Sequence, residues 1–139
     1  MPKPISENIP LGEAHGRVMA ERVLSPIDLP SFDNSAMDGY AVRSTDVAAA
    51  KADCPVRLSV VGKVAAGESF GGELAAASCV RLFTGSPLPA GADAVVMQED
   101  TRPHHEGYIA VVGSVEPGEN IRRAGDDVSE GALDRKSVV

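Results

Sequence analysis

Residues 56–64 read Val-Arg-Leu-Ser-Val-Val-Gly-Lys-Val, and apolar side chains alternate imperfectly with polar ones along this stretch. A period of two places successive side chains on opposite faces of an extended chain, so we expect a strand here. Further strands are expected at residues 79–83, 94–99 and 108–112, with a short extended piece at 121–123. Short strands separated by turns favour a mainly β domain, built as a barrel-like or coiled sheet with short helices and flanking strands.

Only short helices are expected beside these strands. Residues 9–24 carry apolar side chains at helical spacing, which predicts one or two helical turns before Pro26 prevents continuation. Residues 44–46, Ser-Thr-Asp, are typical of a helix start, and Pro55 limits how far that helix extends. Between the two helices, residues 31–40 (SFDNSAMDGY) are rich in turn formers and predict a dense loop.

The composition agrees with one globular domain. The chain has 139 residues, of which 43% are hydrophobic and 24% charged. Its 14 Gly and 10 Pro residues exceed average usage and indicate many short elements joined by turns. Because aromatic residues make up only 4% and Trp is absent, the core must be built from aliphatic side chains.

The charge balance excludes some functions. Thirteen basic against 20 acidic residues give a net charge of -7, and basic residues form no cluster larger than a pair such as Arg122–Arg123. Nucleic acids and anionic membranes are therefore not expected as partners. No apolar run approaches the roughly 20 residues of a membrane span, so we expect a cytoplasmic protein. Cys54 and Cys79 fit reduced, buried thiols, and a disulfide between them stays open.

Three polar clusters could carry chemistry. Residues 33–40 concentrate acceptors and a hydroxyl beside a glycine, although the same composition is typical of a surface turn. Residues 122–127 (RRAGDD) could bind an anion and a divalent cation together, or could form a solvated charged turn. Residues 84–86 (Thr-Gly-Ser) could offer backbone N–H groups to an anion, which is a weak signal alone. No metal-site spacing such as CxxC or HExxH occurs, and His104–His105 is expected to be an exposed loop pair.

The clusters together resemble one family. The run at residues 25–43, with FDNSAMDGYAVR at 32–43, closely resembles the molybdopterin molybdotransferase (MoeA/gephyrin) family. Residues 61–68 (VGKVAAGE), 80–96 (VRLFTGSPLPAGADAVV) and 117–127 (PGENIRRAGDD) follow in the family's order. The resemblance covers roughly residues 12–133, which is nearly the whole chain.

The resemblance implies a part of a larger enzyme. The family's proteins are elongated multidomain dimers that insert molybdate into adenylylated molybdopterin, releasing AMP and forming molybdenum cofactor. It assigns residues 1–24 to the N-terminal part of an elongated first domain and 25–130 to a β-rich second domain. Residues 131–139 become a truncated return strand or tail. The family's pterin- and nucleotide-binding domain has no counterpart here, so we expect an N-terminal fragment that is inactive alone.

Site residues follow by position in the family's motifs. The essential aspartate of NSAMDGY falls on Asp38, and the second acidic residue falls on Asp127; both are implied to be catalytic and metal-binding. The threonine of the family's FTGAP segment falls on Thr84, which with Ser35 and Arg123 is implied to bind substrate. The chain departs from the family in two places, since Ala124 replaces a common third arginine and Asp126 replaces the usual glutamate.

The resemblance also implies Mg²⁺ as cofactor, with molybdate and adenylylated molybdopterin as substrates. A homodimer is expected in the full-length protein, with a molybdopterin-adenylating protein as a further partner. Bare carboxylates would repel anionic substrates, so Asp38 and Asp127 must act through Mg²⁺ or by holding Arg, Ser and Thr donors in place. Two alternatives remain: a non-catalytic β-rich scaffold or interaction module, as in gephyrin-like relatives that cluster receptors, and a free-standing β domain without chemistry. The choice between molybdenum and tungsten also stays open.

Overall fold

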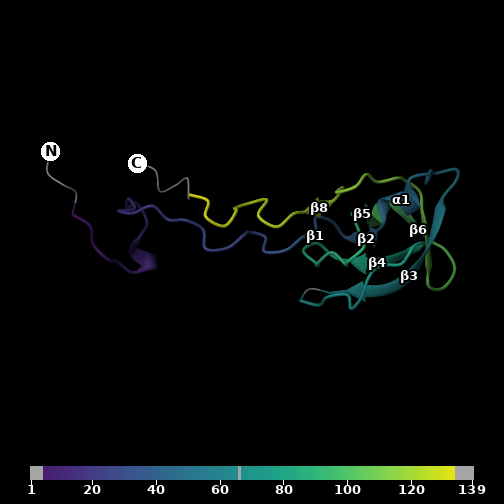
Figure 1. Ribbon diagram of the computed structural model, residues 1–139, viewed down its shortest axis with the longest axis horizontal. Helices are drawn as coiled ribbons and strands as arrows, with labels where there is room; N and C mark the ends of the chain where they lie inside the picture. The colour runs from purple at the N-terminus through teal and green to yellow at the C-terminus, as the bar shows by residue number, and fades with distance from the viewer. Residues whose placement is uncertain (1–4, 66, 134–139) are drawn as a thin grey trace.

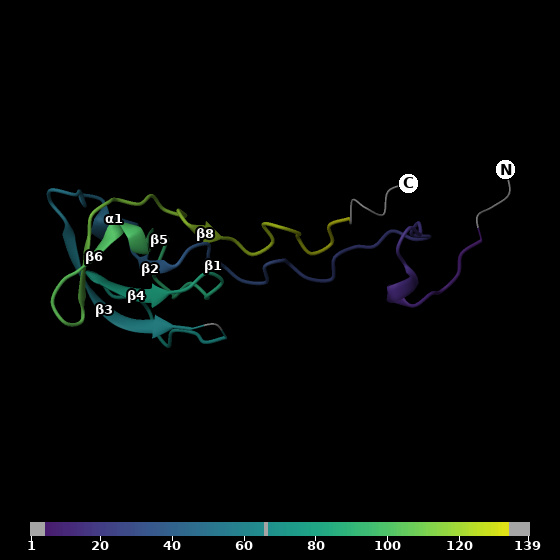
Figure 2. The ribbon, with the colours of Figure 1, turned by 180° about the vertical axis from the view of Figure 1, so that it is seen from behind.

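The computed structural model describes residues 5–65 and 67–133. Strands within residues 34–122 form a β body, and from one end of this body the segments 24–33 and 123–133 extend side by side as an arm (Figure 1). The view from behind shows the same arm leaving the body beside β1 and β8 (Figure 2). The molecule is therefore elongated, with a compact end and a thin end.

Six strands form the main sheet, which curls like half of a barrel in the order β5-β2-β4-β3-β7-β6. The strands are β2 (Gly39–Val42), β3 (Val56–Val64), β4 (Ser78–Leu82), β5 (Ala94–Met97), β6 (Thr101–Pro103) and β7 (Tyr108–Val111). All neighbouring strands are antiparallel except β3 and β4, which are parallel. The predicted mainly β fold is confirmed, as are the strands expected at residues 56–64, 79–83, 94–99 and 108–112, although the third ends at Met97, where a 3-10 turn follows.

Two strands of the main sheet were not predicted. β2 begins inside the stretch that we expected to be a loop, and β6 lies where no strand was expected. A separate two-stranded ladder joins β1 (Asn34–Ser35) to β8 (Ile121–Arg122), with Ser35 opposite Ile121. The predicted dense loop is therefore partly strand, because pairing with distant segments overrides local turn composition.

The helical elements are short, as expected. One 3-10 turn, η1 (Leu11–Glu13), replaces the one or two helical turns expected over residues 9–24. The helix expected from residue 44 is α1 (Ser44–Val47), and a second 3-10 turn, η2 (Gln98–Asp100), follows β5. No helix in the described part of the chain is long and apolar enough to cross a membrane.

Apolar side chains cover both faces of the sheet. On one face, Val42 packs in a cluster that α1 closes with Val47. On the other face, Ala41 and Val80 pack with Leu74. Adjacent residues of β2 thus serve opposite faces, as the strand period requires. Burying one such aliphatic side chain contributes about 1.5–3 kcal/mol, so the two clusters hold β2 firmly in place.

The arm is held by backbone hydrogen bonds between its two segments. The N–H of Leu29 donates to the Val128 carbonyl at 2.7 Å, and the N–H of Ser25 donates to the Ala132 carbonyl at 2.9 Å. Leu24 forms an antiparallel bridge with Leu133, while residues 134–139 of the expected return strand lie outside the described residues. The division at residues 24 and 130 implied by the resemblance stays a prediction.

The expectation for the cysteines was half right. Cys79 is buried in the core, but Cys54 is exposed, and neither forms a disulfide. Cys54 lies in the turn that links α1 to β3, where the chain reverses direction on the surface and no core is available to bury it. Burial raises the pKa of the Cys79 thiol to about 12.

Candidate functional site

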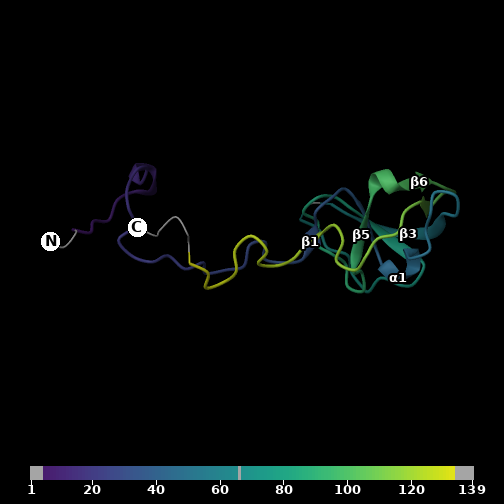
Figure 3. The same ribbon diagram turned by 90° about the horizontal axis from the view of Figure 1, so that it is seen from above.

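The strand directions gather several site residues at the arm end of the body. β3 and β4 run parallel and both end there, as the arrow of β3 shows (Figure 1). β2 is antiparallel to β4, so its first residue lies at the same end. Asp38 directly precedes β2 and Thr84 follows β4 after one residue, which brings the two together. Seen from above, β1 and the start of the arm lie at this same end (Figure 3).

Asp38 is held by two hydrogen bonds from Thr84. The Asp38 Oδ1 atom accepts the backbone N–H of Thr84 at 2.9 Å and its hydroxyl at 3.0 Å. The Thr84 backbone and hydroxyl hydrogen bonds, helped by the charge of Arg81, hold the pKa of Asp38 below its ordinary value. Asp38 is exposed, so the structure presents an ionised carboxylate at a fixed position, and its Oδ2 atom accepts no hydrogen bond from the described residues.

The backbone around Asp38 is fixed by β5 and η2. The N–H of Gln98 donates to the Asp38 carbonyl at 3.0 Å. The next residue, Gly39, pairs with Leu82 and with Met97. A Cβ atom on Gly39 would lie 2.1 Å from the Val96 carbonyl oxygen, so only glycine allows this close approach. The carboxylate of Asp38 is thus carried by a rigid part of the sheet.

Ser35 is placed beside this pair, but inside the body. It is fully buried, and its hydroxyl donates to the Met37 carbonyl. Its backbone N–H donates to the Ser86 carbonyl at 2.9 Å, and its carbonyl accepts the N–H of Gly85 at 2.8 Å. Ser35 therefore joins β1 to the loop that carries Thr84. Its predicted contact with substrate stays a prediction.

Arg123 and Asp127 lie in a second group at the root of the arm. Arg123 forms an ion pair with Asp33 at 2.8 Å, and the N–H of Ala124 donates to the same carboxylate at 2.9 Å. The Asp127 carboxylate forms an ion pair with Arg122. Exposed ion pairs of this kind contribute little to stability, so their main effect is to orient the arginines.

The β1–β8 ladder joins the two groups. Asn34 lies opposite Arg122, and Ser35 lies opposite Ile121, so the residues flanking each group are paired. The structure thus brings Asp38, Thr84 and Ser35 together, and separately brings Arg123 and Asp127 to the neighbouring turn. Among the described residues, no cluster of three or more His, Cys, Asp or Glu side chains is arranged to hold a metal ion.

Comparison with known proteins shows the family. The model of the MoeA N-terminal region (domain I and II) matches residues 1–134. The chain belongs to this family.

Relatives and solved structures of MoeA proteins agree along most of the chain. The molybdopterin molybdenumtransferase of Haemophilus influenzae is 46% identical over 126 residues, which cover 91% of this chain and 30% of that protein. The enzyme of the same name from Synechococcus elongatus is 46% identical over 128 residues, covering 91% and 31%. The structure of the molybdopterin biosynthesis MoeA protein from Pyrococcus horikoshii OT3 matches with a TM-score of 0.87 and 38% identity, over 94% of this chain and 34% of that one. The chain spans about a third of the length of these MoeA proteins.

Sequence reasoning missed two residues of the site. Asp33 lies in the polar cluster at 33–40, but its contact with Arg123 joins residues 90 apart, which no local pattern shows. Arg81 lies within a predicted strand and within the family-like segment 80–96, where it is a single charge in an otherwise apolar run and received no assigned role. The expected exposed loop pair is confirmed, since the rings of His104 and His105 lie 4.3 Å apart on the surface turn before β7.

Proposed function

We propose that this MoeA-family chain supplies the acidic part of an active site that inserts molybdate into adenylylated molybdopterin, releasing AMP and forming molybdenum cofactor. The observation that carries the proposal is the Asp38–Thr84 pair. Two hydrogen bonds to Oδ1 fix an exposed, ionised carboxylate and leave its other edge for a ligand. Because this carboxylate is already held in position, no free energy is spent on reorienting it when the reaction occurs.

A Mg²⁺ ion fits this donor set. Mg²⁺ commonly takes one or two protein carboxylates and completes its coordination with waters and substrate oxygens. Asp38 offers a carboxylate whose Oδ2 atom accepts no hydrogen bond from the described residues, and we propose that Asp127, which is paired with Arg122 in the separate group at the root of the arm, supplies a second one. When bound, Mg²⁺ supplies Lewis-acid polarisation of the phosphoanhydride.

The chain's own residues would bind and orient the anions. Arg123 lies at the root of the arm with its guanidinium oriented by Asp33, and a guanidinium forms strong hydrogen bonds to phosphate and other oxyanions. Thr84 holds the Asp38 carboxylate in place through its backbone N–H and its hydroxyl. Asp127 limits the motion of Arg122 in the same way. The site therefore combines one fixed negative group with oriented positive ones.

The remaining parts of the proposal concern assembly. We propose that the half-site at the arm end of the body faces a pterin pocket on the partner subunit of a homodimer. A molybdopterin-adenylating protein would deliver the substrate, and the compartment would be the cytoplasm. Under this proposal the remaining parts of the active site come from regions outside the third of the relatives' length that this chain matches.

A chimera tests the proposal. Residues of this chain would replace the 126-residue matching region of the Haemophilus influenzae molybdopterin molybdenumtransferase. The chimera would be expressed in a bacterial strain that lacks its own transferase, and molybdoenzyme activity would be measured. We expect restored activity with the unchanged chain and none with Asp38→Asn. The asparagine keeps an oxygen for Thr84 but removes the charge, so the fold should stay intact.

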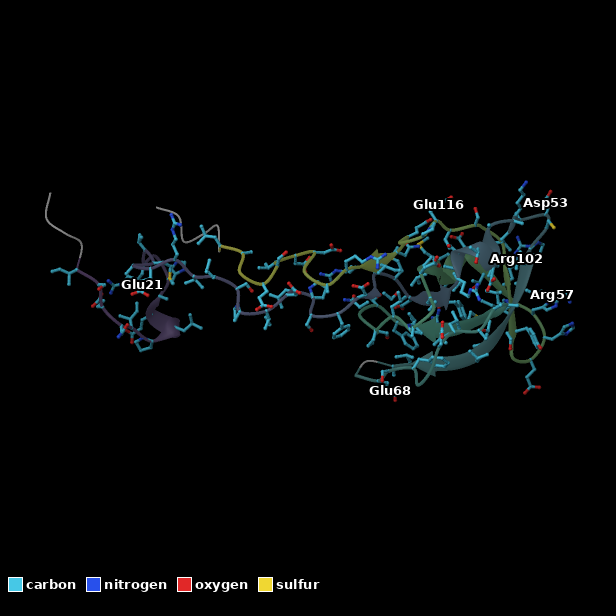
Figure 4. The ribbon with its side chains drawn as sticks, in the orientation of Figure 1. Glu21, Asp53, Arg57, Glu68, Arg102 and Glu116 are labelled. Carbon is cyan, nitrogen blue, oxygen red and sulfur yellow. The ribbon has the colours of Figure 1, made fainter. Side chains whose placement is uncertain are left out.

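Asp53→Asn is the matched control, because Asp53 lies at the end of the body opposite the arm (Figure 4). It removes the same charge and should leave activity unchanged. Full activity of the Asp38→Asn chimera would overturn the catalytic role of Asp38. If the chimera that carries the unchanged chain folds but shows no activity, that result would instead favour the interaction-module alternative.

A further inference from the structure

We propose that Lys63 and Arg81 form, on the ring of Phe83, a binding site for a tetrahedral oxyanion beside the Asp38–Thr84 pair. The ligand class is a phosphate group or molybdate, and the identity of the natural ligand rests on the proposed function.

The strand register places the two basic side chains next to each other. Lys63 of β3 is the direct partner of Arg81 of β4 in the parallel ladder. Arg81 is in turn the partner of Tyr40 in β2. Direct partners on neighbouring strands carry their side chains on the same face of the sheet. Lys63, Arg81 and Tyr40 therefore lie in one row across three strands. This row presents two cations side by side at the arm end of the body.

Aromatic rings hold both cations. The Lys63 ammonium lies 5.3 Å from the centroid of the Phe83 ring, and the Arg81 guanidinium lies 5.1 Å from the same centroid. The guanidinium also lies 5.0 Å from the centroid of Tyr40. Cations at these distances are attracted by the ring quadrupole, which reduces their freedom without neutralising their charge. Phe83 thus fixes two like charges in one place.

Neither cation forms an ion pair with an acid among the described residues, although Asp38 lies close enough to Arg81 for the charge of the guanidinium to lower its pKa. In the described part of the chain, no carboxylate lies within ion-pair distance of Lys63 or Arg81, whereas the arginines at the root of the arm are both paired. Glu68 lies near the same end of β3 (Figure 4), but it accepts the N–H of Ala65 at 3.0 Å. Lys63 and Arg81 thus place two positive charges on neighbouring strands of a chain whose net charge is -7. An anion would relieve their mutual repulsion.

Arg81 also connects this pair to Asp38. Its guanidinium donates to the Gly39 carbonyl at 3.2 Å and to the side-chain oxygen of Gln98. Gly39 follows Asp38 directly, and the N–H of Gln98 donates to the Asp38 carbonyl. Two of the five N–H groups of the Arg81 guanidinium therefore bond to other residues of this chain, and the other three remain for a ligand. Phe83 directly precedes Thr84, so an oxyanion on the pair would lie next to the Asp38–Thr84 contact.

The test is an NMR titration of this 139-residue chain with inorganic phosphate and, separately, with sodium molybdate at low ionic strength. We expect saturable shifts of the Lys63, Thr84 and Gly85 backbone amides. Lys63→Gln should weaken the affinity about tenfold, since it removes one charge-assisted hydrogen bond. Lys63→Arg should retain it. Because Lys63 is exposed, neither substitution disturbs the core.

Lys51→Gln is the matched control, since Lys51 is an exposed lysine between α1 and β3 and its loss changes the net charge equally. Equal weakening by Lys51→Gln would overturn the site in favour of a general charge effect. Shifts confined to Arg122 and Arg123, or no saturable shift with either anion, would overturn it as well. A response to phosphate alone or to molybdate alone supports the site and identifies its ligand. Because binding is measured without cofactor synthesis, this proposal and the proposed function can fail separately.

Discussion

Asp33 and Arg123 lie 90 residues apart in the sequence, yet their side chains form an ion pair of 2.8 Å that closes the root of the arm. The same carboxylate accepts the N–H of Ala124 at 2.9 Å. One aspartate therefore determines both where the returning chain leaves the body and how Arg123 is oriented. The arm and the candidate site are structurally linked through it.

The first prediction concerns the pH dependence of this contact. The hydrogen bond from Ala124, followed by that from Arg123, holds the pKa of Asp33 below its ordinary value of 3.8. A depressed pKa in the folded state stabilises the fold above the ordinary value, and this contribution is lost as the pH falls through the folded-state pKa. We expect the Ala124 amide resonance to stay constant from pH 7 to about 5 and to move only below pH 3.8.

Asp33→Asn is the control for this titration, because an asparagine oxygen still accepts from Ala124 but does not titrate. The acid-range movement of the Ala124 resonance should disappear in that variant. A wild-type resonance that does not move between pH 5 and the lowest pH at which the chain stays folded would contradict the expectation.

The second prediction separates the two hydrogen bonds to Asp38. Thr84→Val removes the hydroxyl donor and keeps the backbone donor, so the pKa of Asp38 should rise part of the way toward its ordinary value. Thr84→Ser keeps both donors and should leave the pKa where it is. Carboxyl carbon NMR titration of the three proteins measures this. Identical Asp38 titrations in all three would mean that the hydroxyl contact does not exist in solution.

Strand β2 illustrates why part of the fold escapes sequence reasoning. Alternation identified β3 because nine residues carry a visible period. β2 has only four residues and includes Gly39 and Ala41, which are depleted in strands. Both residues are small because β2 lies between β4 and β5, where Gly39 is required for the approach of Val96. The small residues that allow β2 to lie between β4 and β5 therefore also leave it without the pattern by which a strand is recognised in a sequence.

The candidate site was also only partly predictable from the sequence. The resemblance identified Asp38 and Thr84 as separate motif positions, but only the pairing of β2 with β4 shows that they touch. Arg81 lies in the family-like segment 80–96, but the resemblance assigned it no role, and its importance comes from the cross-strand neighbours Lys63 and Tyr40. Residue types can be predicted locally, whereas contacts between segments 40 or more residues apart depend on the register of the sheet.

The third prediction uses the two cysteines as probes of folding. The thiolate is the reactive form, and burial raises the pKa of Cys79 to about 12, while Cys54 is exposed. A thiol reagent at pH 8 should therefore label one cysteine quickly in the folded chain and the second only on addition of denaturant. Mass spectrometry counts the labels, and Cys54→Ser should abolish the fast one. Rapid double labelling of the native chain would contradict the burial of Cys79.

The last prediction concerns the glycine that supports Asp38. In Gly39→Ala the new Cβ would lie 2.1 Å from the Val96 carbonyl oxygen, so β2 and β5 must separate. Overpacking of this kind typically costs about 1–3 kcal/mol, and backbone atoms cannot yield as a flexible side chain would. Urea denaturation should show this loss, together with a shifted Thr84 amide resonance, because Asp38 moves with β2. Gly12→Ala is the matched control, since no atom lies within 4 Å of its added Cβ. A Gly39→Ala variant as stable as Gly12→Ala would mean that β2 does not pack against β5 as the register requires.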